Sequence, residues 1–149
     1  MSSTSKTPMT LESVLPEHRS LFIDGAWCEP LDGAYVQTLN PANGKALASV
    51  ANASAADVDQ AVAAARKAFP GWSALQPLER ARYLRQAAQV LREHAEELAM
   101  IDAFNTGNPV AEMVRDAQVA ATGLEFFAGL ITQIKGETIP MGEGMLNYT

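Results

Sequence analysis

The chain has few residues that could crosslink it or bind a transition metal. Cys28 is the one cysteine among 149 residues, so no disulfide can form within the chain. A single thiol is typical of proteins from reducing compartments. The two histidines, His18 and His94, are too far apart in sequence to form a metal-ligand motif. We expect Cys28, at the end of a predicted strand, to be a structural or surface thiol.

Long apolar runs and an excess of positive charge are also missing. No run approaches the roughly 20 apolar residues that span a bilayer, and residues 1–20 lack the apolar segment of a secretory signal. The 11 basic and 17 acidic residues give a net charge of −6, which argues against nucleic acid or an anionic membrane as a partner. We expect a cytoplasmic protein with a polar N-terminal arm over 1–20.

The first third of the remaining chain has the pattern of short strands. Residues 21–28 (LFIDGAWC) carry an Asp-Gly turn between two apolar runs, which predicts a β-hairpin. Two more strands are predicted at 35–39 and 46–50, on either side of a turn at 40–44 (NPANG).

Helical periodicity follows. Ser54 is a predicted N-cap that forms a capping box with Asp57, and Pro70 with Gly71 is predicted to end this first helix. A second helix is predicted from Pro77 to about residue 94 and a third over about 95–106. The stripe of the first helix consists of Val58, Ala61, Val62, Ala65 and Phe69.

The stretch 79–109 is the most regular part of the chain. Leucines recur every seven residues, at Leu84, Leu91 and Leu98, and together with Ala87, Ala88, Ala95 and Ile101 they form an apolar stripe. The stripe ends at the sequence NTGNP. There, Gly107 is predicted to take the left-handed cap, Asn108 to N-cap the next helix and Pro109 to lie in its first turn.

A last helix is predicted over 110–134, followed by a β-hairpin within 137–149. Gly123 and Gly129 each cost about 1 kcal/mol in a helix relative to alanine. Their presence predicts that a neighbouring helix, backbone or ligand approaches closely at these positions.

Several of these stretches resemble the aldehyde dehydrogenase superfamily. The helix with "ERA..L..A...L....EELA" ending in "TGNP", the turn "NP..G" and the segment 124–149 all have family-like wording. The resemblance runs over about 21–149 and is nearest to betaine-aldehyde members. The family pattern "V..AV.AA+.AF..W" is matched at Val58, Ala61, Val62, Ala64, Ala65, Phe69 and Trp72.

The resemblance implies an α/β fold that is incomplete here. It has an N-terminal β-hairpin or meander, four mainly amphipathic helices and a C-terminal β-hairpin, and it is mostly helical as it stands. Residues 21–149 would be the N-terminal part of the cofactor-binding domain, ending in the start of the oligomerisation strands. The family implies NAD or NADP as cofactor, an aldehyde substrate oxidised to a carboxylic acid, and a homo-oligomer, dimer or tetramer.

The family's reaction residues lie further along than this chain extends. A catalytic cysteine, a general-base glutamate and a glycine-bearing cofactor turn find no match here, so we expect no catalytic or cofactor-binding residue and no activity from the chain alone. An end in mid-strand predicts a truncated or partial reading frame whose helices expose an apolar face. The alternative is a non-enzymatic interaction module that binds a longer aldehyde dehydrogenase or another partner.

Two sets of site residues follow from the resemblance. Many family members hold a monovalent cation, and the matching positions are Thr38, Leu39 and Asn105, where Asn105 replaces the usual aspartate. Asn108 likewise stands where the family commonly has lysine. Val119, Gly123 and Phe127 match the helix face that lines the substrate tunnel, with core packing as the alternative for each.

Overall fold

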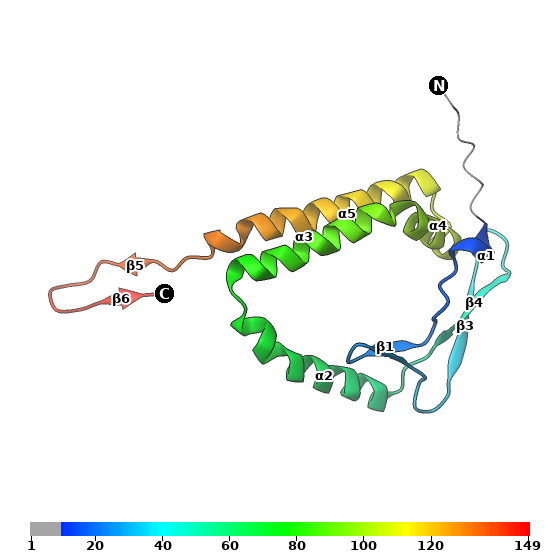
Figure 1. Cartoon of the computed structure of the whole chain (residues 1–149), viewed down its shortest axis with the longest axis horizontal. Helices are drawn as coiled ribbons and strands as arrows, with labels where there is room; N and C mark the ends of the chain where they lie inside the picture. Colours follow the sequence, from blue (N-terminus) through cyan, green and yellow to red (C-terminus); the bar gives the residue numbers. More distant parts are fainter. Residues whose placement is uncertain (1–9) are drawn as a thin grey trace, which may run out of the picture.

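The structure, a computed structural model, describes residues 10–149. Helices α3, α4 and α5 form one body, α2 stands apart from it, and a C-terminal hairpin projects from the far end (Figure 1). The helices are α1 (Leu11–Val14), α2 (Ala55–Ala74), α3 (Pro77–Glu93), α4 (Ala95–Thr106), α5 (Val110–Leu130) and the 3₁₀ helix η1 (Ile131–Gln133). The strands are β1 (Leu21–Ile23), β2 (Ala26–Cys28), β3 (Tyr35–Leu39), β4 (Ala46–Ala51), β5 (Thr138–Ile139) and β6 (Asn147–Tyr148).

Small side chains hold α3 and α5 together. Ala81 and Ala88 of α3 and Ala121 and Ala128 of α5 are all buried, and in each helix the two alanines lie seven residues apart. Because side-chain size sets the distance between packed helices, this alanine seam brings the two backbones close. Ala95 and Ala99 of α4 are also buried, and α4 packs against α5.

The leucine stripe predicted over the same stretch is only partly correct. Leu84 and Leu91 are half-buried at the edge of the seam, whereas Leu98 and Ala87 are exposed. Ala81, outside the predicted stripe, is fully buried. The alanines, and not the leucines, therefore face α5 directly.

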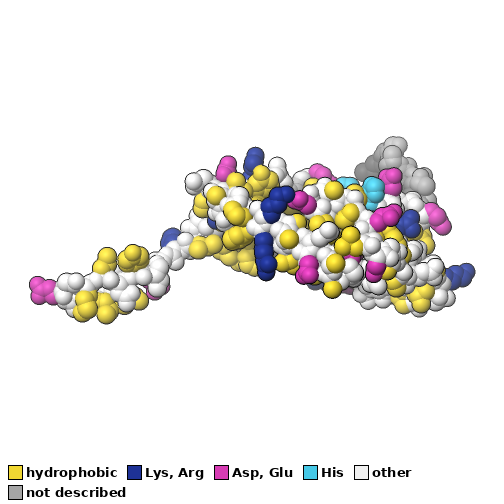
Figure 2. Space-filling view, turned by 90° about the horizontal axis from the view of Figure 1, so that it is seen from below, with side chains coloured by type: hydrophobic (Ala, Val, Ile, Leu, Met, Phe, Trp, Pro, Cys, Tyr) yellow, Lys and Arg dark blue, Asp and Glu magenta, His cyan; other side chains and the backbone are white. Residues whose placement is uncertain are grey.

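The predicted exposed apolar face is confirmed. The accessible surface is 11154 Å², whereas a compact monomer of 15.9 kDa exposes about 7,400 Å². Val58 and Phe69 of α2 are exposed, and the projecting hairpin shows several apolar side chains in Figure 2.

Helix α2 continues through Pro70 and Gly71, so the prediction that they end it was wrong. The Ser73 hydroxyl donates a hydrogen bond to the Pro70 carbonyl at 3.1 Å. The Arg80 guanidinium then donates to the carbonyls of Ser73 at 3.3 Å and Leu75 at 2.6 Å. These bonds satisfy carbonyl groups of the last turn, which supports the helix beyond the proline.

The three predicted hairpins are confirmed. Asp24 and Gly25 both have positive φ, 52° and 80°, as a two-residue turn between β1 and β2 requires. Strand β3 pairs antiparallel with β4, and β5 pairs with β6. Residues 11–14 of the predicted polar arm form α1, with Val14 buried, while residues 1–9 lie outside the described part of the chain.

The junction between α4 and α5 differs from the prediction at one position. Gly107 takes the left-handed cap with φ of +79°, as expected. Pro109 and not Asn108 is the N-cap of α5, because the Pro109 carbonyl accepts from the N–H groups of Glu112 and Met113. Its extended ψ of 134° keeps Pro109 outside the first turn. Helix α5 ends at Leu130, four residues earlier than predicted.

Asp57 ties the start of α2 to the preceding loop. Its carboxylate accepts hydrogen bonds from the Ser54 hydroxyl at 2.7 Å, the Ser54 N–H at 2.8 Å and the Leu31 N–H at 3.1 Å. The bond from the Ser54 hydroxyl lowers the pKa of Asp57 most; burial raises it, and the two backbone bonds lower it further. The net direction is a pKa below the usual aspartate value. The predicted capping box is confirmed.

Asp57→Asn is expected to change how stability depends on pH. Because the native pKa is lowered, the Asp57 carboxylate stabilises the folded chain above the ordinary aspartate pKa of about 3.9, and this contribution is lost as the pH falls through the native value. Urea unfolding from neutral to acidic pH should therefore show a smaller loss in Asp57→Asn than in the wild type. Asp59→Asn, an exposed carboxylate in the same helix, is the control. Equal acid losses in Asp57→Asn and the wild type would contradict the expectation.

Gly107→Ala is expected to destabilise the chain by about 1–2 kcal/mol. An L-residue at φ of +79° is strained, and a methyl group there would lie 3.0 Å from the Pro41 ring. Gly71→Ala is the matched control, since its Cβ would meet nothing within 4 Å and its φ is not positive. Chemical denaturation of both variants tests this, and a Gly107→Ala variant as stable as Gly71→Ala would refute it.

Candidate functional site

The two motif turns of the sequence meet in space. Asn40 is buried, and its side-chain oxygen accepts from the Ala42 N–H at 2.9 Å, which fixes the turn between β3 and β4. Pro41 of this turn lies directly against Gly107 at the end of α4. The NP turn and the TGNP turn, 66 residues apart at Pro41 and Gly107, thus form one contact.

Beside this contact is the β3–α4 hollow, with a volume of about 250 Å³. Thr38 and Asn105, two of the three predicted cation ligands, both line it. Leu39, the third, does not line it and is 56% exposed. The other lining residues are Leu15, Pro16, Arg19, Leu47, Ala48, Val50 and Ile101.

The strand pair is irregular where it borders the hollow. Thr38 pairs with Ala48 and Leu39 with Ala46, so Leu47 is an extra residue on β4. Such a bulge locally disrupts the ladder. The Thr38 hydroxyl donates to the Ala48 carbonyl at 3.3 Å.

The residues present fit a monovalent cation poorly. Hard cations prefer several oxygen ligands, commonly with carboxylate charge, yet the hollow is mainly apolar and no carboxylate lines it. Asn105 contributes a neutral amide, and Arg19 brings a positive charge to the same wall. Among residues 10–149, no group of three or more His, Cys, Asp or Glu side chains is placed to hold a metal ion. The cation site stays a prediction.

The predicted tunnel residues share one face of α5. Val119, Gly123 and Phe127 are four residues apart in turn, and this spacing puts them on the side opposite to Ala121 and Ala128 of the alanine seam. Val119 and Phe127 are 62% and 64% exposed. A Cβ added at Gly123 or at Gly129 would meet nothing within 4 Å. Close packing at these two glycines, predicted from the sequence, is therefore absent within the described chain.

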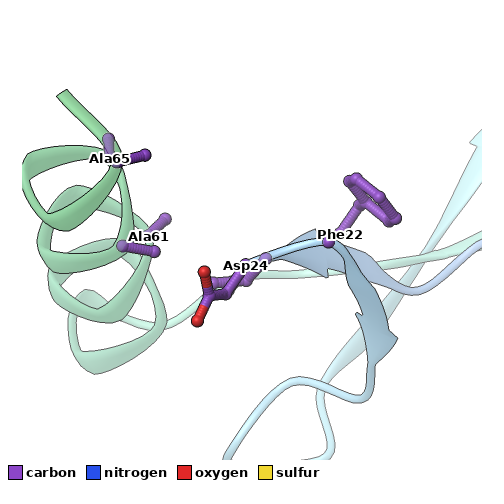
Figure 3. A pocket seen from close by; sticks show the side chains of 8 residues that line it. Phe22, Asp24, Ala61 and Ala65 are labelled. Atoms are coloured by element: carbon purple, nitrogen blue, oxygen red, sulfur yellow. The ribbon is translucent and has the colours of Figure 1, made fainter. Parts of the chain in front are cut away.

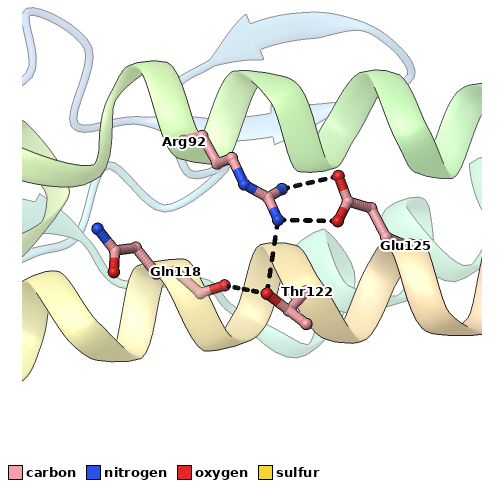
Figure 4. A network of polar contacts seen from close by, with 4 residues as sticks. All are labelled: Arg92, Gln118, Thr122 and Glu125. Atoms are coloured by element: carbon pink, nitrogen blue, oxygen red, sulfur yellow. Dashed lines mark hydrogen bonds and ion pairs between the residues drawn. The ribbon is translucent and has the colours of Figure 1, made fainter.

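An ion pair that the sequence did not predict sets α5 against α3. Arg92 donates to both carboxylate oxygens of Glu125, at 2.9 and 2.8 Å, and to the Thr122 hydroxyl at 3.5 Å (Figure 4). The Thr122 hydroxyl in turn donates to the Gln118 carbonyl at 2.9 Å. Two parallel bonds fix direction as well as distance. Since the pair is partly exposed, its contribution to stability is about 1 kcal/mol at most.

A second hollow of about 320 Å³ lies between the β1–β2 turn and α2. Figure 3 shows Asp24 directed toward the helix that carries Ala61 and Ala65, whereas Phe22 is directed away from it. The Asp24 carboxylate is already paired with Lys67 at 3.1 Å. Alanines form most of the helix side, so this hollow offers no unpaired reacting group.

No described helix is long and apolar enough to cross a membrane. Cys28 is half-buried at the end of β2, with no disulfide partner. His18 stacks on Trp27 with ring centroids 5.0 Å apart, and His94 contacts Glu97 at 2.9 Å on the surface of α4. These side chains are not assembled into one cluster, so the described residues form a scaffold with apolar faces.

Comparison with known proteins identifies that scaffold. Residues 27–149 match the model of the "Aldehyde dehydrogenase family". The chain is 49% identical over 142 residues to the aldehyde dehydrogenase tropH of Talaromyces stipitatus, covering 93% of this chain and 28% of that protein.

Solved structures agree in fold and extent. The NAD⁺ complex of aldehyde dehydrogenase from Bacillus cereus is 35% identical with a TM-score of 0.86, over 93% of this chain and 29% of that one. PnpE from Pseudomonas sp. WBC-3 is 39% identical with a TM-score of 0.81, over 88% and 27%. The chain thus spans less than a third of the length of each of these relatives. The nearness to betaine-aldehyde members is untested by these names and stays a prediction. The match over 123 of 149 residues and the shared fold show that this chain belongs to the aldehyde dehydrogenase family.

Proposed function

We propose that this chain forms the N-terminal segment of an NAD(P)-dependent aldehyde dehydrogenase that oxidises an aldehyde to a carboxylic acid. The observation that carries the proposal is the similarity, in sequence and in fold over 93% of the chain, to an enzyme solved with NAD⁺. Residues 21–149 serve as part of the cofactor-binding domain and supply structure, not reacting groups.

The chemistry indicates how the work is divided. Aldehyde oxidation through a thiohemiacetal needs a nucleophilic thiolate, donors to the oxyanion, a nicotinamide to accept hydride and a base to activate water. The described hollows contain none of these as an assembled set. The described chain instead offers exposed apolar side chains on α2 and α5, such as Phe69 and Phe127, which are suited to packing against the remainder of the enzyme.

The C-terminal hairpin supports assembly into a homo-oligomer, a dimer or a tetramer. Strands β5 and β6 pair only with each other within the described chain, and Met145, Leu146 and Tyr148 are exposed on or beside them. Unpaired strand edges with apolar side chains favour pairing with another strand. We further propose a cytoplasmic location, with neither nucleic acid nor a membrane as partner, in keeping with the net charge of −6.

A chimera tests the proposed function. Residues 10–149 replace the matching segment of the Bacillus cereus aldehyde dehydrogenase, and reduction of NAD⁺ is followed with a panel of aliphatic and aromatic aldehydes and betaine aldehyde. We expect the chimera to oxidise aldehydes, while the 149-residue chain alone does not. A chimera that folds and binds NAD⁺ but oxidises no aldehyde would contradict the proposal, and would favour an interaction module instead.

Gly123→Ala separates stability from substrate binding. Because a methyl group there has open space, the variant should unfold with a free energy up to about 1 kcal/mol higher. If the face of Val119, Gly123 and Phe127 lines the aldehyde tunnel, the same methyl raises KM for bulky aldehydes in the chimera while leaving kcat for small aldehydes unchanged. Gly129→Ala, on a different side of α5 and equally unhindered, should gain stability without a change in KM. Identical KM values in the two variants would remove Gly123 from the tunnel.

A further inference from the structure

We propose that in this chain the Arg19 guanidinium takes the place that a monovalent cation has in relatives, so that the β3–α4 hollow needs no bound cation. The inference uses the family membership but not the proposed activity. It starts from a disagreement: the positions assigned to cation ligands by resemblance come together at a hollow whose fixed charge is positive.

The backbone holds Arg19 beside that hollow. The Arg19 carbonyl accepts from the Ala51 N–H at 2.9 Å, which extends the edge of β4 by one bond. The Arg19 Nε donates to the Pro16 carbonyl at 3.2 Å, and Pro16 also lines the hollow. Within residues 10–149, no carboxylate forms an ion pair with Arg19. The guanidinium charge is therefore held at the hollow without a described counter-ion.

Electrostatics then disfavours a second cation. A sphere of 250 Å³ is about 8 Å across, so an ion inside lies within about that distance of the guanidinium. At about 8 Å and an effective dielectric constant of about 20, the repulsion lowers the affinity for a monovalent cation roughly 30-fold.

Asn105 fits the same interpretation. An aspartate at this position would supply charge for a bound ion, whereas the Asn105 amide is neutral and tolerates a neighbouring guanidinium without forming an ion pair. A guanidinium also brings five N–H donors that can reach carbonyl oxygens which would otherwise bind the ion. Arg19 and Asn105 together thus replace a mobile charge with a covalently attached one.

The test compares cations at constant ionic strength. The thermal unfolding of the full chain is followed by circular dichroism in choline chloride, KCl and NaCl, for the wild type, Arg19→Met and the double variant Arg19→Met/Asn105→Asp. Lys67→Met, which removes one positive charge from an exposed ion pair elsewhere, is the matched control. Titration with thallium(I), a probe for K⁺, followed by NMR gives a second measurement that does not require a cooperative transition.

For the wild type and Lys67→Met we expect the same Tm in all three salts and no saturable thallium(I) binding. The double variant should be less stable in choline chloride, regain about 2–4 °C in KCl or NaCl, and bind thallium(I) saturably. Arg19→Met should show the same pattern with a smaller shift, since it lacks the added carboxylate. A wild-type chain stabilised by K⁺ or Na⁺ over choline, or a double variant with no cation dependence, would overturn the inference. Neither readout involves aldehyde oxidation, so failure of the proposed activity would leave this result intact.

Discussion

The alanine seam between α3 and α5 is the contact on which the rest of the structure depends. Ala81 and Ala88 meet Ala121 and Ala128, and these small side chains allow close approach while burying little area each. At roughly 25 cal/mol for each Å² of apolar surface, such a seam stabilises less than a core of leucines would. The helices therefore associate closely but leave much of their larger apolar surface outside.

That constraint determines which faces remain available. Once Ala121 and Ala128 face α3, the helical repeat directs Val119, Gly123 and Phe127 to the opposite side. The two bonds between Arg92 and Glu125 act at the edge of the seam and oppose rotation of α5 about its axis. A pair worth little in stability can thus still decide which side chains α5 presents.

The sequence predicted features whose cause is local. The turn at Asp24 and Gly25, the capping box of Ser54 and the left-handed Gly107 each depend on residues within three positions of one another. It failed where a distant residue decides the outcome. Helix α2 passes Pro70 because Arg80, ten residues on, satisfies carbonyls of its last turn.

The same distinction applies to the candidate sites. Periodicity placed Val119, Gly123 and Phe127 on one face correctly, because a helix repeats in a fixed way. Nothing in the spacing indicated that Arg92 would reach Glu125, 33 residues away, or that the two motif turns would meet at Pro41 and Gly107. These contacts arise from the packing of whole elements and not from any local pattern.

Family resemblance transfers positions more safely than it transfers chemistry. Thr38 and Asn105 do line one hollow, as their motif positions suggested, so the backbone arrangement carries over. The charge there depends on side chains that the motifs do not fix, an amide at Asn105 and a guanidinium at Arg19, which lies outside both motifs. Since ion binding depends on net charge as much as on the number of oxygen ligands, a conserved backbone frame is compatible with the loss of the ion, provided that a nearby side chain supplies its charge.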